Sequence, residues 1–148
     1  MLFRSLMFVD ASVIVAILGR EPGHQELEKR LAATEGPYFV SPLVMFEASV
    51  GLARQKSTTR PTPELVRQAR RAVEAFIEDL GAVEMEISPE IGKQALEASA
   101  TYGKAVGHPA DLNFGDCFAY ACAKSLAVAI LYKGDDFAQT DAVSALSA

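Results

Sequence analysis

The stretch Leu6-Met7-Phe8-Val9-Asp10-Ala11-Ser12-Val13-Ile14-Val15-Ala16-Ile17-Leu18 places one aspartate in the middle of apolar or small residues. A buried strand does not keep a charge at its centre unless that charge is paired or binds a metal. We therefore expect a strand over residues 6–9, with Asp10 at its carboxyl end, and a helix that begins near Ser12. Ligands bind at the carboxyl ends of strands in open α/β sheets, which places Asp10 for chemistry. Aspartate is also a common helix N-cap, and this stretch alone favours neither interpretation.

The composition is typical of one compact domain over residues 1–148. Half of the residues are hydrophobic and 22% are charged, which is enough for one core and gives no sign of disorder. The net charge of −5 argues against a protein that coats nucleic acid. Cys117 and Cys122 match no zinc or redox spacing and predict reduced thiols in a cytoplasmic protein. No run reaches the ~18 uninterrupted apolar residues that span a bilayer, so we expect no membrane contact.

Helices and strands are expected to alternate along the rest of the chain. Periodicity and turn residues predict helices over 24–34, 42–56, 64–80, 89–102 and 117–126, and strands over 38–40, 82–87 and 128–131. The Ser-Pro pairs at 41–42 and 88–89 each mark a helix start, with Ser as N-cap and Pro in the first turn. A short edge strand is expected near the end of the chain. This alternation predicts an α/β fold, a three-layer α/β/α sandwich with a mostly parallel central sheet.

Carboxylates recur at the ends of these elements. Asp10 follows the first strand, Asp116 lies at a helix start, Asp135 and Asp136 follow the last clear strand, and Glu47 lies in a helix among apolar neighbours. Singly, most of them also fit as helix caps or turn residues. Four carboxylates in one cleft would repel, and at least one would hold a proton at neutral pH. A divalent cation removes that conflict, and oxygen ligands without His or Cys favour Mg²⁺ or Mn²⁺, as in phosphodiester hydrolysis.

Four segments of the chain resemble the PIN-domain ribonucleases and, within them, the VapC toxins of bacterial toxin–antitoxin pairs. The segments are FVDAS at 8–12, SPLVMFE at 41–47, LNFGDCFAYA at 112–121 and ILYKGDDFAQTD at 130–141. They follow the family order and cover nearly the whole chain. The resemblance implies a metal-dependent endoribonuclease toxin that cleaves cellular RNA, has a PIN-like α/β/α fold and is neutralised by a cognate VapB-type antitoxin.

The resemblance also implies roles for the acidic residues. Asp10 and Asp116 would be the principal ligands of Mg²⁺, for which Mn²⁺ could substitute, and Glu47 would complete the catalytic set. The hydroxyl of Ser12 would support Asp10 or the substrate phosphate.

The fourth carboxylate departs from the family pattern. Many relatives carry Thr-x-Asp just after the last strand, but Tyr132 and Gly134 stand at those places here. We therefore expect the fourth catalytic carboxylate at Asp136, with Asp135 as the alternative.

Basic and apolar residues suggest partners. Six basic residues stand against one acid, Glu64, between positions 54 and 71, namely Arg54, Lys56, Arg60, Arg67, Arg70 and Arg71. RNA could lie there, although the last three also fit a solvated helix face. Lys104, Lys124 and Lys133 are further candidates, and His108 is expected to be a loop residue rather than a base. We expect an antitoxin helix to cover apolar residues that include Val44, Leu52 and Leu65, and we expect a symmetric homodimer.

Two other classes of function are less consistent with the sequence. A PIN-like scaffold that binds RNA or protein without cleaving it would have lost its acidic residues, but Asp10, Glu47 and Asp116 are all present. A small-molecule phosphatase or hydrolase would be expected to carry a P-loop or a G-x-S-x-G elbow, and the chain has neither.

Overall fold

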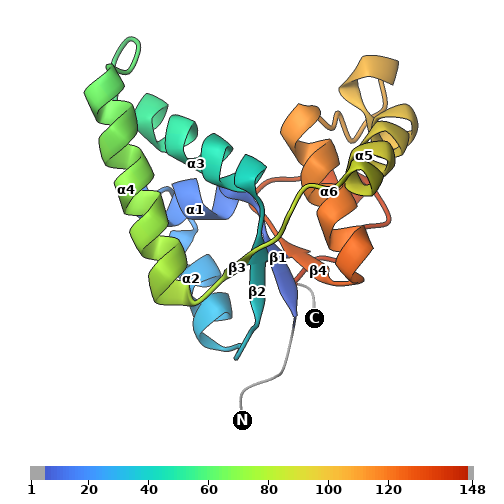
Figure 1. The fold of residues 1–148 in the computed structure, drawn as a ribbon, viewed down its shortest axis with the longest axis horizontal. Helices are drawn as coiled ribbons and strands as arrows, with labels where there is room; N and C mark the ends of the chain where they lie inside the picture. Colours follow the sequence, from blue (N-terminus) through green and yellow to red (C-terminus); the bar gives the residue numbers. More distant parts are fainter. Residues whose placement is uncertain (1–5, 147–148) are drawn as a thin grey trace.

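One parallel sheet forms the centre of the computed structural model, which describes residues 6–146 (Figure 1). Within that range the strands are β1 (Met7–Val9), β2 (Tyr38–Val40), β3 (Val83–Glu84) and β4 (Ala129–Leu131). Their order across the sheet is β3-β2-β1-β4, and each neighbouring pair is parallel. The predicted α/β class is therefore confirmed.

Helices cover both faces of this sheet (Figure 1). On one side lie α1 (Ala11–Leu18), α2 (His24–Ala32), α3 (Pro42–Gln55) and α4 (Pro63–Leu80), and on the other lie α5 (Pro89–Tyr102) and α6 (Phe114–Leu126). Two short 3₁₀ turns, η1 (Lys104–Val106) and η2 (Asp136–Gln139), complete the described part of the chain. The result is the three-layer sandwich that the alternation of elements predicts.

Side-chain caps set the helix starts. The hydroxyls of Ser41 and Ser88 accept hydrogen bonds from the backbone N–H groups three residues on, both at 3.2 Å, as the Ser-Pro pairs predict. Helix α6 begins earlier than expected, because Asn113 is its N-cap and accepts from the Asp116 N–H at 2.9 Å. The Asp116 carboxylate accepts from the Asn113 N–H at 3.1 Å, so Asp116 is the other half of a capping box and not the cap itself.

Both edges of the sheet differ from the sequence-based expectation. Strand β3 covers only Val83–Glu84, both exposed, where the alternating pattern predicts a strand over 82–87. It has one neighbouring strand, and after the Met85 N–H bonds to the Val40 carbonyl at 2.8 Å the chain leaves for α5. At the other edge, the end of the chain contributes one bridge between Ile130 and Ser144 rather than a full strand.

The core surrounds β1, whose three residues are fully buried. Val44 and Leu52 belong to this core, with 2% and 1% of their surface exposed, so the expectation that an antitoxin helix covers these two residues is wrong. Leu65 is partly buried against the same core. Phe46 and Phe114 are exposed instead, at 68% and 70%.

Two further sequence expectations concern thiols and membranes. Cys117 and Cys122 are free, as their spacing predicts, and both are buried. None of the helices between residues 6 and 146 has the length and apolar character needed to cross a membrane.

Strand β1 occupies the position that places Asp10 for function. The chain runs from β1 through β2 to β3 on one side and returns to β4 on the other, so the strand order reverses at β1. Ligand sites in open α/β sheets lie at the carboxyl ends of strands where this reversal occurs. The ends of β1 and β4 therefore frame the candidate site, and they are joined where the Asp10 N–H donates to the Leu131 carbonyl at 3.0 Å.

Candidate acidic site

A pocket of about 440 Å³ opens at the carboxyl end of β1. Its lining comes from the turn after β1, from α1, α3 and α6, and from the turns after α1 and β4. The lining residues are Asp10, Ala11, Ser12, Val15, Glu21, Glu47, Asp116, Lys133 and Gly134. Three of the four carboxylates singled out from the sequence thus share one pocket.

Asp10 is the most buried of these carboxylates, with 6% of its surface exposed. Its Oδ2 accepts from the Ser12 N–H at 3.1 Å, which makes it the N-cap of α1 as well as a pocket residue. The two interpretations of Asp10 are therefore compatible. Burial raises the pKa of Asp10 above its ordinary value, and the hydrogen bonds from Ser12 and Ala11 oppose that rise only in part.

Glu47 projects from the second turn of α3 against the start of α6. Its carboxylate occupies the space beside the Cα of Gly115, so a methyl group at that position would overlap both carboxylate oxygens. The absence of a side chain at Gly115 thus lets Glu47 lie against α6. Burial, followed by the charges of Asp10 and Asp116, raises the pKa of Glu47 to about 7.

Asp116 is held on the first turn of α6 by its capping box. Burial and, less strongly, the charges of Asp10, Asp136 and Asp111 raise the pKa of Asp116, the hydrogen bond from Asn113 lowers it, and the net pKa is about 6. With Glu47 titrating near neutrality, the pocket holds a proton at neutral pH for part of the time. Burial is the largest cause of these raised pKa values, and the mutual repulsion expected from the sequence adds to it.

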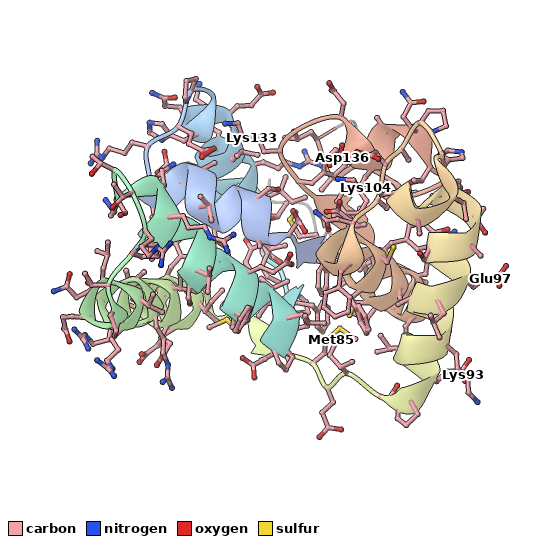
Figure 2. All side chains as sticks on the ribbon, turned by 90° about the horizontal axis from the view of Figure 1, so that it is seen from above. Met85, Lys93, Glu97, Lys104, Lys133 and Asp136 are labelled. Atoms are coloured by element: carbon pink, nitrogen blue, oxygen red, sulfur yellow. The ribbon has the colours of Figure 1, made fainter. Side chains whose placement is uncertain are left out.

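Asp136 lies outside the pocket lining, exposed at the start of η2 (Figure 2). Its charge nevertheless raises the pKa of both Asp10 and Asp116, so it lies close enough to act on the pocket. Of the two alternatives after β4, Asp136 is therefore better placed than the preceding residue, Asp135, which is also exposed.

Glu21 and Lys133 also line the pocket, and no sequence motif links these two residues. The Lys133 ammonium donates to Glu21 Oε1 at 2.8 Å, and the Gln55 amide donates to Glu21 Oε2 at the same distance. The Lys133 backbone N–H donates to the Ser12 hydroxyl at 3.0 Å. Glu21-Pro22-Gly23 is ordinary turn chemistry, so no local signal marks Glu21 as a pocket residue.

The basic run from residue 54 to 71 separates into two groups. On α4, Arg71 and Arg67 lie 3.2 and 3.9 Å from Glu64, and Arg70 pairs with Glu74, so these arginines form the solvated helix face anticipated from the sequence. The other group lies at the end of α3 and in the loop that follows.

Two other candidates from the sequence serve the structure elsewhere. Lys124 pairs with Asp141 at 2.6 Å, outside the acidic pocket. His108 Nδ1 accepts from the Ala110 N–H at 3.0 Å and its ring packs against Tyr102, as expected of a loop residue.

The donor chemistry of the pocket suits a hard divalent cation. Its ligating side chains are carboxylates and one hydroxyl, which Mg²⁺ and Mn²⁺ prefer. The gap at Gly115 leaves the Glu47 carboxylate room beside α6. Between residues 6 and 146, however, no three His, Cys, Asp or Glu side chains are already arranged to hold one ion.

The chain matches one family of known proteins over most of its length. A family model described as the PIN domain matches residues 7–143. A VapC ribonuclease of Rhizobium meliloti is 51% identical over 140 residues, covering 92% of this chain and 99% of the relative. Ribonuclease VapC42 of Mycobacterium tuberculosis is 32% identical over 135 residues, covering 91% of this chain and 95% of the relative.

Solved structures share the fold at low sequence identity. VapC20 of Mycobacterium tuberculosis, a Sarcin-Ricin loop cleaving toxin, superimposes with a TM-score of 0.71 at 18% identity and covers 93% of this chain and 96% of its own. A toxin–antitoxin complex from Klebsiella pneumoniae has a TM-score of 0.62 at 17% identity, with 93% and 94% coverage. The solved structures share the fold alone, whereas the family-model match over residues 7–143 and the 51% identity show that the chain belongs to the PIN-domain family and, within it, to the VapC ribonucleases.

Proposed function

We propose that this protein is a metal-dependent endoribonuclease toxin that cleaves cellular RNA and is neutralised by a VapB-type antitoxin. The observation that carries the proposal is the convergence of Asp10, Glu47 and Asp116 on one pocket, in a chain 51% identical to a VapC ribonuclease. Membership of the family supports RNA as the substrate. The pocket supplies the concentration of carboxylates that a divalent ion would neutralise.

In this proposal Asp10 and Asp116 hold Mg²⁺, for which Mn²⁺ substitutes, and Glu47 completes the catalytic set. An ion bound there would activate water and would neutralise charge on the phosphodiester. Ser12 keeps Asp10 in place through its N–H, and the Asn113 N–H does the same for Asp116. Asp136 contributes negative charge from the rim of the site.

The proposed partners follow from the charge and the apolar surface around the pocket. An antitoxin that presents an arginine would suit the acidic pocket, because the planar guanidinium pairs bidentately with carboxylates. Phe46 directly precedes Glu47, and Phe114 lies two residues before Asp116; these two rings are 68% and 70% exposed. A symmetric homodimer that covers these rings would place two acidic pockets close together. We expect the protein to act in the cytoplasm, where its RNA substrate is found.

Cleavage of total cellular RNA by the purified protein tests this function. Mg²⁺ or Mn²⁺ should support cleavage, EDTA should abolish it, and the protein encoded beside this chain's gene should inhibit it when added in equal amount. A small phosphomonoester, tested in parallel, should remain intact. Hydrolysis of the small ester without RNA cleavage would instead indicate a phosphatase, and RNA binding without cleavage would indicate a scaffold.

Gly115→Ala tests the position of Glu47. The added methyl group displaces the Glu47 carboxylate, which is the end of a flexible side chain, so the fold should persist. We expect kcat for RNA cleavage to fall roughly 10- to 100-fold, because small misplacements of catalytic groups have effects of that size. The melting temperature should be unchanged or slightly higher, since Ala is a better helix former than Gly.

Gly92→Ala is the matched control for this substitution. Gly92 also lies in a helix, α5, and a Cβ there would meet nothing within 4 Å. In a Glu47→Gln background, Gly115→Ala should cause little further loss, because both changes act on one group. Full activity of Gly115→Ala would show that the location of the Glu47 carboxylate does not matter.

A further inference from the structure

The ion pair between Lys133 and Glu21 lies where three segments of the chain meet at one border of the acidic pocket. Lys133 comes from the turn after β4 and Glu21 from the turn after α1, and both line the pocket. Gln55, the last residue of α3, donates to the second oxygen of the same carboxylate at 2.8 Å. Its amide also fills the space in which a Cβ of Gly19 would lie. The end of α3 is thus packed directly on the end of α1.

Three more basic residues are direct sequence neighbours of Glu21 or Gln55. Arg20 precedes Glu21 in the chain, and Arg54 and Lys56 stand on either side of Gln55. All three are exposed, and across residues 6–146 none of them forms an ion pair. They differ in this from the arginines of α4, whose charges are matched by Glu64 and Glu74.

The periodicity of α3 connects this basic surface to the pocket. Arg54 follows Glu47 by seven residues, which is two helical turns, so both lie on the same face of α3 and about 10 Å apart along its axis. Glu47 lines the pocket. A chain of phosphates that begins at the pocket and follows α3 would therefore reach Arg54.

We propose that Arg20, Arg54, Lys56 and Lys133, here called the basic rim, bind the backbone phosphates of the RNA strand as it leaves the acidic pocket. The inference rests on the proposed ribonuclease function and adds the direction that the substrate takes. A protein with a net charge of −5 repels a polyanion except where cations are left unmatched, and within residues 6–146 Arg20, Arg54 and Lys56 have no ion-pair partner. Glu21 holds the Lys133 ammonium at the border of the pocket, and Gln55 holds Glu21.

The salt dependence of RNA binding tests the rim. The ligand is a fluorescein-labelled, mixed-sequence single-stranded RNA, and the protein carries Asp116→Asn so that the RNA is not cleaved. The rim variant combines Arg20→Gln, Arg54→Gln and Lys56→Gln, which leaves the pocket lining untouched. The control combines Arg67→Gln, Arg70→Gln and Arg71→Gln on α4, which makes the same change in net charge.

Each phosphate contact to a single strand contributes about 0.7 to the slope of log Kd against log salt concentration. Removing three contacts should therefore lower the slope by about 2. When the salt concentration rises approximately fourfold, the Kd of the Asp116→Asn parent should increase about 18-fold more than the Kd of the rim variant. The control should keep the slope of that parent.

Any one of three results would contradict the proposal that the basic rim binds RNA. The rim variant could keep the slope of the Asp116→Asn parent, the control could lose as much slope as the rim variant, or the rim variant could bind RNA normally and lose affinity for the antitoxin. The last result would make this surface a protein interface. If the protein with intact Asp116 cleaves RNA but the rim variant binds RNA normally, the rim proposal fails and the ribonuclease function stands. If the protein with intact Asp116 neither binds nor cleaves RNA, both the rim proposal and the ribonuclease function fail.

Discussion

Replacing Asp116 with asparagine is expected to reduce metal-dependent RNA cleavage by at least ~100-fold, because the site loses a charge that would hold the ion. Asparagine retains an oxygen that can accept from the Asn113 N–H, so the capping box and the start of α6 should survive. Asp10→Asn should have a similar effect on cleavage, since its amide oxygen can still accept from the Ser12 N–H. Cleavage rates on a labelled RNA and thermal melting of the same samples measure the two properties separately.

Asp135→Asn is the matched control for these substitutions. It removes a carboxylate from the turn after β4, but Asp135 forms no side-chain cap and is exposed. We expect its activity to stay near that of the parent, and Asp136→Asn to cause a smaller loss than Asp116→Asn because Asp136 lies outside the pocket lining. If both Asp10→Asn and Asp116→Asn retained cleavage, the acidic pocket would have no part in the reaction.

The positions of Asp10 and Asp116 could be read from the sequence because each depends on local patterns. The apolar run before Asp10 predicts a buried strand, and the alternation of elements predicts that the strand is parallel to its neighbours. These two predictions together place Asp10 at the carboxyl edge of the sheet. Glu47 stood out because its apolar neighbours leave it little polar surface, and the structure places it against α6.

Other parts of the site depend on contacts between segments that are distant in the sequence. Glu21 lies in an ordinary turn and becomes a pocket residue only because Lys133 and Gln55 reach it from two other segments. Gly115 matters because a side chain from another helix fills the space beside it. Likewise, the sequence shows that Val44 is apolar but not which surface of α3 faces the core, so its complete burial was not anticipated.

The acidic pocket should also make the thermal stability of the protein depend on pH and on divalent metal. Folding raises the pKa of Glu47 from 4.5 to about 7 and that of Asp116 from 3.8 to about 6. At a pH between the unfolded and the folded pKa of each group, the folded protein keeps a proton that the unfolded chain has released. The free energy of unfolding therefore falls as the pH rises through this window. Without metal, we expect the melting temperature to decrease from about pH 4.5 to about pH 7 on account of these two groups.

A divalent ion should reverse this loss, because it binds the ionised carboxylates of the folded protein. At a concentration of about 100 times its Kd, Mg²⁺ would add about 2.7 kcal/mol to the free energy of unfolding. For a chain of this length, that corresponds to a rise in melting temperature of about 5–10 °C. The rise should be larger at pH 7.5 than at pH 5, since protons compete with the metal for the same oxygens.

Glu47→Gln distinguishes the pocket from the rest of the protein's acidic surface. It removes one of the repelling charges, so the metal-free protein should melt at a higher temperature near pH 7 and lose part of its pH dependence. Its response to Mg²⁺ should be weaker than that of the parent. Glu97→Gln, an exposed position on α5, should change neither property. A parent protein whose melting temperature ignores Mg²⁺ and rises between pH 4.5 and 7 would contradict the clustered site, because isolated and solvated carboxylates do not repel one another in this way.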